Sequence, residues 1–423
     1  MRMRKRAARG FTLVEVMVSG ALLTVILGGA MVVVVGVNGA SERVRRVGDA
    51  QETARIALDG LAEEIRQAGA GALSGQIGVA PAGSGTRRIP TIYSGPDVVV
   101  MGPNNVTTIV TNSIYIISAD PTAGVPTSDA KFMLGDVSAA VQGQPIQIVC
   151  SSPLDPVPPG PQTDCSSTAV KYGGGTLLLS SGGVFQPLIV GDYVEAVYLR
   201  PTALGAVAGG SQTLTFAEQL AGAFSPSAKA PFGFAQGAYI SRARVSHWYL
   251  KQIPGNNDYE LVRSHPLLTT NALGGGCLPS DAPFVDETTA GGPGVPVGTI
   301  VGSGPVESLQ FRYIVDDQVK DDSQAFSIWN GLPGTPTPAK NATDLNHFTV
   351  CDTAEILKLR EVRIQIVARA SQPDHAQNAT SRVNRYSTPA FEGVAPSDNG
   401  TDAYPRRSFE TRVVPRNLQG VRI

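Results

Sequence analysis

The chain has 423 residues, of which 42% are hydrophobic and 16% charged, and its formal net charge is −1. Its 47 glycines and 31 prolines together stay below the share that is typical of low-complexity chains. The near-neutral charge argues against a nucleic-acid-binding protein, because such proteins generally carry a positively charged surface that contacts the phosphates.

The N-terminus joins a basic leader to a long apolar run. Residues 1–10 contain five basic side chains and no acidic one, and between residues 11 and 37 the only ionisable side chain is Glu15. Twenty-seven helical residues span about 40 Å, which is enough to cross a bilayer of about 30 Å. The basic leader predicts that the N-terminus stays cytoplasmic while the rest of the chain faces out.

Glu15 is the feature that a plain membrane anchor leaves unexplained, because a carboxylate at membrane depth costs about 2.5–3.5 kcal/mol. An ordinary secretory signal does not fit either. Its apolar core has only about 7–15 residues and a small-residue cleavage site follows that core. Here the small residue, Gly10, lies before the apolar run.

The segment Arg9-Gly10-Phe11-Thr12-Leu13-Val14-Glu15 resembles the class III signal of type IV pilins and type II secretion pseudopilins. The resemblance implies that prepilin peptidase, a membrane aspartyl peptidase, cuts after Gly10. It also implies that Phe11 becomes the methylated N-terminus and that Glu15 is the assembly residue.

Cleavage after Gly10 would place a positively charged amine on Phe11 in a layer of low dielectric constant, where pairing with Glu15 offsets both charges. Residues 11 and 15 are four apart, so the pair can form within one helix. The resemblance implies the other arrangement, in which Glu15 meets the Phe11 amine of a neighbouring subunit and sets its axial register in a filament.

The helix is predicted to continue beyond the membrane to about residue 68, over about 85–90 Å in total. An apolar stripe with steps of three and four is expected to pack on the chain's own globular domain, with a coiled-coil partner as the alternative. Gly69 and Gly71 predict the C-terminal stop. The stripe consists of Val44, Val47, Ala50, Ala54, Leu58, Leu61, Ile65 and Ala68.

Beyond residue 70, apolar segments alternate with turn signals, and residues 254–258 read as a hairpin turn. Val362, Ile364 and Ile366 alternate with Arg363 and Gln365, as expected for a half-buried antiparallel strand. The fold class predicted is α+β, with one long helix laid on a β-rich head. Strands are predicted at 97–101, 106–117, 145–150, 176–180, 192–199, 237–250, 259–263, 306–315, 360–369 and 408–414.

Four further stretches resemble one group of these proteins. LAEEIRQAGAG is similar to the end of the helix in PilW-type minor pilins, and VESLQFRYIVDD, LREVRIQIVARA and RRSFETRVVPRN are similar to their C-terminal half and, more loosely, to GspJ pseudopilins. The expected organisation is a cleaved leader (1–10), a transmembrane assembly helix (11–37), an amphipathic continuation (38–71), a variable region with an inserted lobe or elaborated loops (72–236) and a C-terminal β-sheet region (237–423).

The four cysteines, Cys150, Cys165, Cys277 and Cys351, lie in the part expected outside the cytoplasm, where disulfides persist. Three pairings exist in principle, and we favour 150–165 and 277–351. Closing a loop of about 15 residues stabilises by roughly 3 kcal/mol in the entropy model. A metal site is the weaker alternative, because there is no Cys-x-x-Cys and no histidine at ligand spacing.

No catalytic, cofactor or metal motif emerges from the sequence. The four histidines, His247, His265, His347 and His375, are scattered, and the glycine runs lack the setting of phosphate loops. Asp316, Asp317, Asp321 and Asp322 form an acidic loop whose spacing differs from an EF-hand. Without the leader the net charge falls to about −6, which argues further against nucleic-acid binding.

Removal of the leader leaves 413 residues, far more than a usual major pilin has, and a bulky head is most easily accommodated at a filament tip. The leading hypothesis is a minor pilin that primes assembly and takes part in adhesion or motility. It would sit in the inner membrane before assembly, with its head in the periplasm, and then contact major and minor pilins and a tip adhesin. The alternatives are a type II secretion pseudopilin and a membrane-anchored binding module.

Overall fold

A computed structural model describes the chain in ranges that cover the long helix and most of the strands. These ranges are 12–72, 75–79, 87–101, 108–119, 146–149, 171–172, 175–176, 187–191, 196–208, 211–216, 239–253, 259–268, 284–285, 299–301, 305–315, 327–328, 356, 359–369, 386–387, 401–402 and 406–418. Structural statements below refer to these residues.

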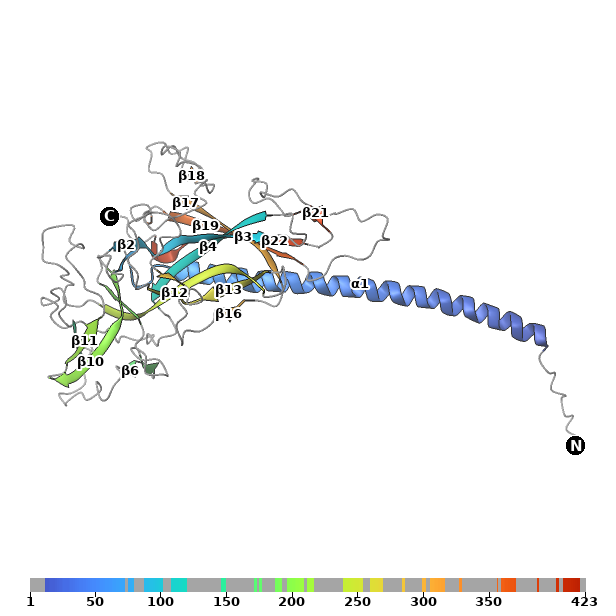
Figure 1. Cartoon of the computed structure of the whole chain (residues 1–423), viewed down its shortest axis with the longest axis horizontal. Coiled ribbons are helices and arrows are strands. Elements are labelled where there is room, and N and C mark those ends of the chain that lie inside the picture. Colours follow the sequence, from blue (N-terminus) through green and yellow to red (C-terminus); the bar gives the residue numbers. More distant parts are fainter. Residues whose placement is uncertain are drawn as a thin grey trace, which may run out of the picture.

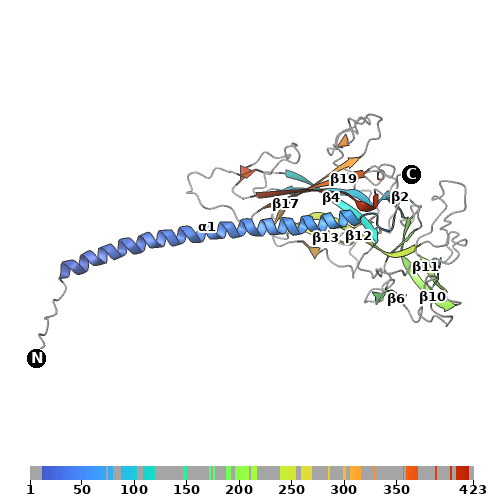
Figure 2. The same cartoon turned by 180° about the vertical axis from the view of Figure 1, so that it is seen from behind.

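One helix, α1 (Leu13–Gln67), dominates the shape of the molecule, and its N-terminal half projects far from the head (Figure 1). Its 55 residues correspond to about 82 Å. The helix ends where predicted, because Gly69 and Gly71 adopt positive φ angles of 73° and 80° that other residues rarely adopt. The helix curves gently without a break at its internal glycines (Figure 2).

The larger sheet has nine strands and is built around β12 (Tyr239–Gln252). Along its length β12 pairs with β8, β4 and β13, in each case antiparallel. The sheet order is β16-β13-β12-β8-β9-β1-β2, with β4 also pairing β12 and β3. The other strands are β1 (Gln76–Val79), β2 (Arg87–Pro90), β3 (Ile92–Met101), β4 (Thr108–Ala119), β8 (Leu188–Gly191), β9 (Ala196–Leu199), β13 (Tyr259–Ser264) and β16 (Thr299–Ile300).

A second sheet of four strands has the order β18-β17-β19-β22, and its pairs are antiparallel. These strands are β17 (Val306–Val315), β18 (Ser327–Ile328), β19 (Leu359–Arg369) and β22 (Arg406–Val413), and a short 3-10 helix, η5 (Arg416–Leu418), follows. The Thr111 hydroxyl on β4 donates to the Leu309 carbonyl on β17 at 2.8 Å and accepts from the Leu309 amide at 2.9 Å. This side chain therefore links the two sheets edge to edge.

The remaining strands form small sheets. A three-stranded sheet has the order β10-β11-β5 and lies at the end of the head opposite the projecting helix (Figure 1). Its strands are β10 (Pro201–Ala208), β11 (Ser211–Phe216) and β5 (Ile146–Val149). The two-stranded pairs are β14 (Leu267–Leu268) with β15 (Phe284–Val285), β20 (Tyr386–Ser387) with β21 (Thr401–Asp402), and β6 (Lys171–Tyr172) with β7 (Gly175–Thr176).

The core lies where the C-terminal part of α1 packs against both large sheets. The helix contacts β22, β19 and β4, and its Glu64 binds Trp248 on β12. Leu61 and Ile65 of the helix are fully buried beside Val362 and Ile364 of β19 in one continuous hydrophobic cluster. Burial of apolar area at about 25 cal/mol per Å² makes this contact the main source of cohesion between helix and sheets.

The α+β class is confirmed, and each predicted strand coincides at least in part with an observed one. The predicted hairpin is present, since β12 and β13 pair antiparallel on either side of 254–258. Residues 177–180 and 192–195, parts of two predicted strands, lie outside the described residues. The short strands β1, β2, β10 and β11 were not predicted, because they lack a clear apolar period.

Two expectations need correction. Val44 belongs to the stripe predicted to pack on the head, but it is 73% exposed, and the first buried residue of the helix that the structure describes is Thr53. Gln365 was placed on the exposed face of its strand, but it is only 1% exposed, and its amide donates to Glu410 on β22 at 2.9 Å. This hydrogen bond offsets part of the cost of burying the amide, which the alternation of residue types does not reveal.

Gly95 on β3 provides a test of the sheet packing. A Cβ atom at this position would lie 2.8 Å from Tyr115 Cε2 and 3.0 Å from His247 Nε2. We therefore expect Gly95→Ala to lower the free energy of unfolding by about 1–3 kcal/mol. Thermal unfolding of the full chain in detergent would measure it.

Gly48→Ala is the matched control, because its Cβ would meet nothing within 4 Å on an exposed helical turn. It should leave the unfolding temperature unchanged or raise it slightly, by up to about 1 kcal/mol of helix propensity. Equal unfolding temperatures for Gly95→Ala and the unsubstituted chain would contradict the close packing of β3 against β4 and β12.

Candidate assembly segment

The projecting helix begins with a capping box formed by Thr12 and Glu15. Thr12 has an extended backbone, with φ −78° and ψ 149°, and its hydroxyl accepts a hydrogen bond from the Glu15 amide at 3.3 Å. In return, Oε2 of Glu15 accepts from the Thr12 amide and from the Thr12 hydroxyl, each at 3.0 Å. This reciprocal arrangement satisfies donors that the first turn of a helix leaves without partners.

Glu15 therefore has a role within its own chain that the sequence analysis did not anticipate. Both bonds from Thr12 end on Oε2, and Oε1 accepts no hydrogen bond from any residue that the structure describes. Gly10 and Phe11 lie outside the described residues, so the pairing of Glu15 with the Phe11 amine stays a prediction.

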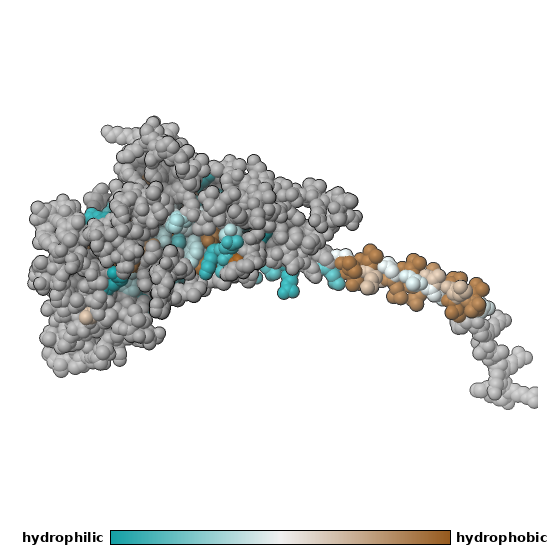
Figure 3. All heavy atoms as spheres, viewed as in Figure 1, coloured by the Kyte–Doolittle hydropathy of each residue, from teal (hydrophilic) through white to brown (hydrophobic). Residues whose placement is uncertain are grey.

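The helix beyond the capping box is apolar around its whole circumference. Residues Leu13–Asn38 are long and apolar enough to cross a membrane, and none of the described head covers them (Figure 3). The Thr24 hydroxyl donates to the Gly20 carbonyl at 2.5 Å, so this polar group is satisfied within the helix. The exposed large side chains are Leu13, Val14, Val16, Met17, Val18, Leu22, Leu23, Val25, Ile26, Leu27, Met31, Val32, Val33, Val34, Val35 and Val37.

Such a surface requires an apolar environment. A soluble monomer rarely exposes a contiguous apolar patch of this extent, and a helix that is apolar all round belongs in a membrane or in a bundle of similar helices. Because every backbone group within the helix is satisfied internally, the segment can move from lipid to a protein interior without exposing unpaired amides.

Comparison with known proteins decides the class of this segment. A family model described as the prokaryotic N-terminal methylation motif matches residues 5–31. The N-terminal segment is therefore that of a type IV pilin-like protein with a class III signal. The search of curated proteins and the search of solved structures gave no match.

This class gives the segment its general role. A class III signal implies processing by prepilin peptidase, and the apolar helix fits a membrane-anchored pilin whose partners are other pilins. Proteins with this motif are structural rather than enzymatic. The motif spans both the leader and the start of the helix, which agrees with the resemblance noted in the sequence.

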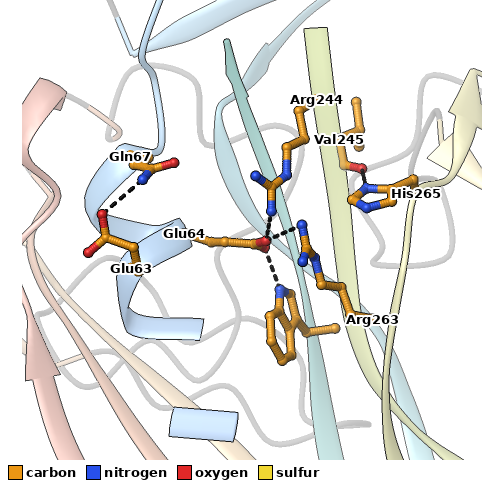
Figure 4. Close-up of polar contacts among 8 residues, drawn as sticks. Glu63, Glu64, Gln67, Arg244, Val245, Arg263 and His265 are labelled. Atoms are coloured by element: carbon orange, nitrogen blue, oxygen red, sulfur yellow. Dashed lines mark hydrogen bonds and ion pairs between the residues drawn. The ribbon is translucent and has the colours of Figure 1, made fainter. Parts of the chain in front are cut away.

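A second polar centre joins this stem to the head. Glu64, in the last turns of α1, is only 7% exposed, and both of its oxygens are bound by residues of the nine-stranded sheet (Figure 4). Trp248 Nε1 on β12 donates to Oε2 at 2.6 Å, Arg263 Nη2 on β13 lies 2.6 Å from Oε1, and Arg244 Nη2 on β12 also donates to Oε1. No local sequence pattern connects Glu64 with these donors, because nearly 200 positions of the chain separate it from them.

The neighbouring Glu63 shows the contrast on the same turn of helix. Its side chain is exposed on the outer face and accepts a hydrogen bond from Gln67 at 2.8 Å (Figure 4). That bond, assisted by Arg66, holds the pKa of Glu63 below its usual value. Of two adjacent carboxylates, only Glu64 connects the helix to the head.

The other candidate residues either lie outside the described residues or pack within the sheet. The cysteines Cys150, Cys165, Cys277 and Cys351 and the acidic loop at 316–322 lie outside the described residues, and within the described ranges no group of His, Cys, Asp and Glu is arranged to hold a metal. His247 stacks between Tyr115 and Tyr249, with ring centroids 4.0 and 4.6 Å away. Its neighbour Trp248 faces the helix and donates to Glu64.

The capping box gives a testable prediction about the start of the helix. Thr12→Val keeps the side-chain shape but removes the hydroxyl, and should destabilise the first turn by about 0.5–2 kcal/mol. Carbon-13 chemical shifts of residues 13–15 in detergent micelles should move toward coil values. Thr12→Ser retains the hydroxyl and should keep helical shifts. Identical shifts in the valine variant would show that the cap does not determine where the helix starts.

Proposed function

We propose that this protein is a minor pilin of a type IV pilus, located at the filament tip, where it primes assembly. The observation that carries the proposal is the combination of a pilin-type stem with a head of unusual bulk. The stem is one 55-residue helix, and the head is built from two large sheets and several smaller ones. In the inner membrane, the N-terminus would lie in the cytoplasm and the head in the periplasm.

The bulk of the head favours the tip over the shaft. A shaft subunit is surrounded by copies above and below, so its head must fit a closely repeated space. The three-stranded β10-β11-β5 sheet extends the head at the end opposite the stem (Figure 2). A subunit at the tip has no neighbour above it, so this extension meets no obstacle there and is free to contact a tip adhesin or a surface. Adhesion and motility are the processes that such a contact would serve.

The geometry of Glu15 supports a role in joining subunits. Cleavage after Gly10 would leave Thr12 as the second residue of the mature chain, so the capping box can survive processing. Oε1 of Glu15 would then be available to a cation while Oε2 keeps its bonds to Thr12. In a bundle of apolar helices the ammonium group of a neighbouring Phe11 is such a cation, and each charge makes burial of the other less costly.

Processing and assembly can be separated by substitution. Co-expression with prepilin peptidase should give a protein whose intact mass corresponds to a methylated N-terminus at Phe11. Glu15→Ala should be cleaved at the same bond but be reduced at least tenfold in sheared filaments, because the buried amine of the neighbour loses its counter-charge. Glu52→Ala, which removes an exposed carboxylate from the same helix, should be incorporated normally. A mature chain that still begins at Met1, or normal incorporation of Glu15→Ala, would contradict this assignment.

Position in the filament can be tested by immunogold labelling of the head. We expect gold particles at one end of each filament. In a strain that lacks the gene, we expect the number of filaments to fall while their length stays ordinary. Labelling along the whole shaft would contradict the tip location. Normal piliation combined with a block in protein secretion would instead support a type II secretion pseudopilin.

A further inference from the structure

The contact between α1 and the head raises the question of what prevents the helix from sliding along its own axis. The contact runs over residues 53–68, a length of about 24 Å. Its buried apolar residues are Ala54, Ala57, Leu61, Ala62, Ile65 and Ala68. They recur every three or four positions, so a shift of one turn, about 5.4 Å, replaces one apolar residue by another. Hydrophobic burial is non-directional and discriminates weakly between such positions.

Glu64 is the polar exception within this surface. Its carboxylate receives three donors from two strands, Trp248 and Arg244 on β12 and Arg263 on β13, and it is held in one place by all of them (Figure 4). A buried charge of this kind contributes little net stability, because desolvation offsets the attraction between the charges. Its removal from its partners, in contrast, is expensive, since two arginines would then lack their carboxylate.

Trp248 also contacts the preceding turn of the helix. The position of Gly60, four residues before Glu64, would place a Cβ atom 3.4 Å from Trp248 Cη2, so the indole ring lies directly against the helix there. If the helix moved one turn toward its C-terminus, Ile56 would collide with the ring and Gly60 would face the arginines. If it moved one turn the other way, Ala68 would face the arginines and the Glu64 carboxylate would meet the ring. Either displacement removes the carboxylate from all three donors.

We infer that Glu64 and its three donors set the axial register of the helix against the head. Glu64 acts as a positioning residue, and Gly60 and Trp248 provide the steric part of the same device. The consequence for a filament rests on the proposed function. Glu15 and Glu64 are separated by 49 positions, or about 74 Å along the helix, so this register determines the height of the head above the assembly residue.

The test measures the register directly in the full-length protein in detergent. Ketone-bearing amino acids placed at Arg55, which is exposed on the helix, and at Gln252, which is exposed at the end of β12, allow spin labelling without use of the native cysteines. Double electron–electron resonance should give one narrow distance distribution for the unsubstituted chain. The triple variant E64M/R244M/R263M keeps side-chain volume and leaves no unpaired charge, so it should stay folded. We expect its distribution to broaden or to gain a second population displaced by about one turn.

The control E63M alters the neighbouring exposed carboxylate and should keep the original narrow distribution. If the triple variant is folded and retains that distribution, the inference is wrong. If it fails to fold, E64Q decides the matter with the same labels, because its amide lacks the charge that pairs with both arginines: a shifted fraction supports the inference and an unchanged narrow distance overturns it. These distances do not depend on filament formation. A displaced register with normal incorporation into filaments would contradict only the filament consequence, whereas loss of incorporation by Glu15→Ala tests the proposed function separately.

Discussion

The constraint on which the molecule depends is that one continuous helix must satisfy two different environments. Residues 13–38 are apolar on every side and have no covering partner in the described head, while residues 53–68 bury one face against two sheets. Between them lies an exposed stretch in which Arg45, Asp49 and Glu52 face solvent. The backbone hydrogen bonds of a helix are internal, so the same secondary structure serves lipid, water and protein core without interruption. Only the distribution of side chains changes along its length.

Two glutamates mark the two ends of this helix, and their surroundings assign them opposite tasks. Among the residues that the structure describes, the Glu15 carboxylate binds Thr12 alone, through one oxygen, and it lies on the uncovered part of the stem. Glu64 has both oxygens occupied by an indole and two guanidinium groups of the head. In an apolar environment, a carboxylate oxygen without a hydrogen-bond donor favours binding of a donor from another molecule. A carboxylate whose two oxygens both accept hydrogen bonds instead stabilises the contact that it already makes. The carboxylate near the start of the helix thus keeps one oxygen without a described donor, whereas both oxygens of the carboxylate near its end bind the head.

The features that the sequence predicted are those governed by local pattern. The apolar run, the steps of the stripe and the glycines at 69 and 71 determine where the helix lies and ends, and long apolar strands such as β12, β17 and β19 follow from their residue types. The part that could not be predicted depends on contacts between distant segments. Helical spacing places Glu64, unlike Glu63, on the buried stripe, three residues after Leu61 and four before Ala68, but it does not reveal the arginines that β12 and β13 bring to it. Val44 continues the stripe in sequence, yet the head does not extend far enough to cover it.

The arrangement of β12 suggests how so large a head can be carried without disturbing the stem. Its first residues, Tyr239–Arg242, pair with β8, whereas Ala243–Trp248 pair with β4 and His247–Gln252 pair with β13. Arg244 and Trp248, which bind Glu64 of the helix, belong to the middle section of β12. The strand that pairs with the beginning of β12 therefore takes no part in this contact. Of the strands contributed by residues 72–236, β4 pairs with the middle section of β12, whereas β8 and β9 join the sheet at its beginning, and β10 and β11 follow β9 directly in the chain. Because the donors to Glu64 lie in the middle of β12 and on β13, additions that join the sheet through β8 and β9 enlarge the head without displacing these donors, and the height of the core above Glu15 stays unchanged.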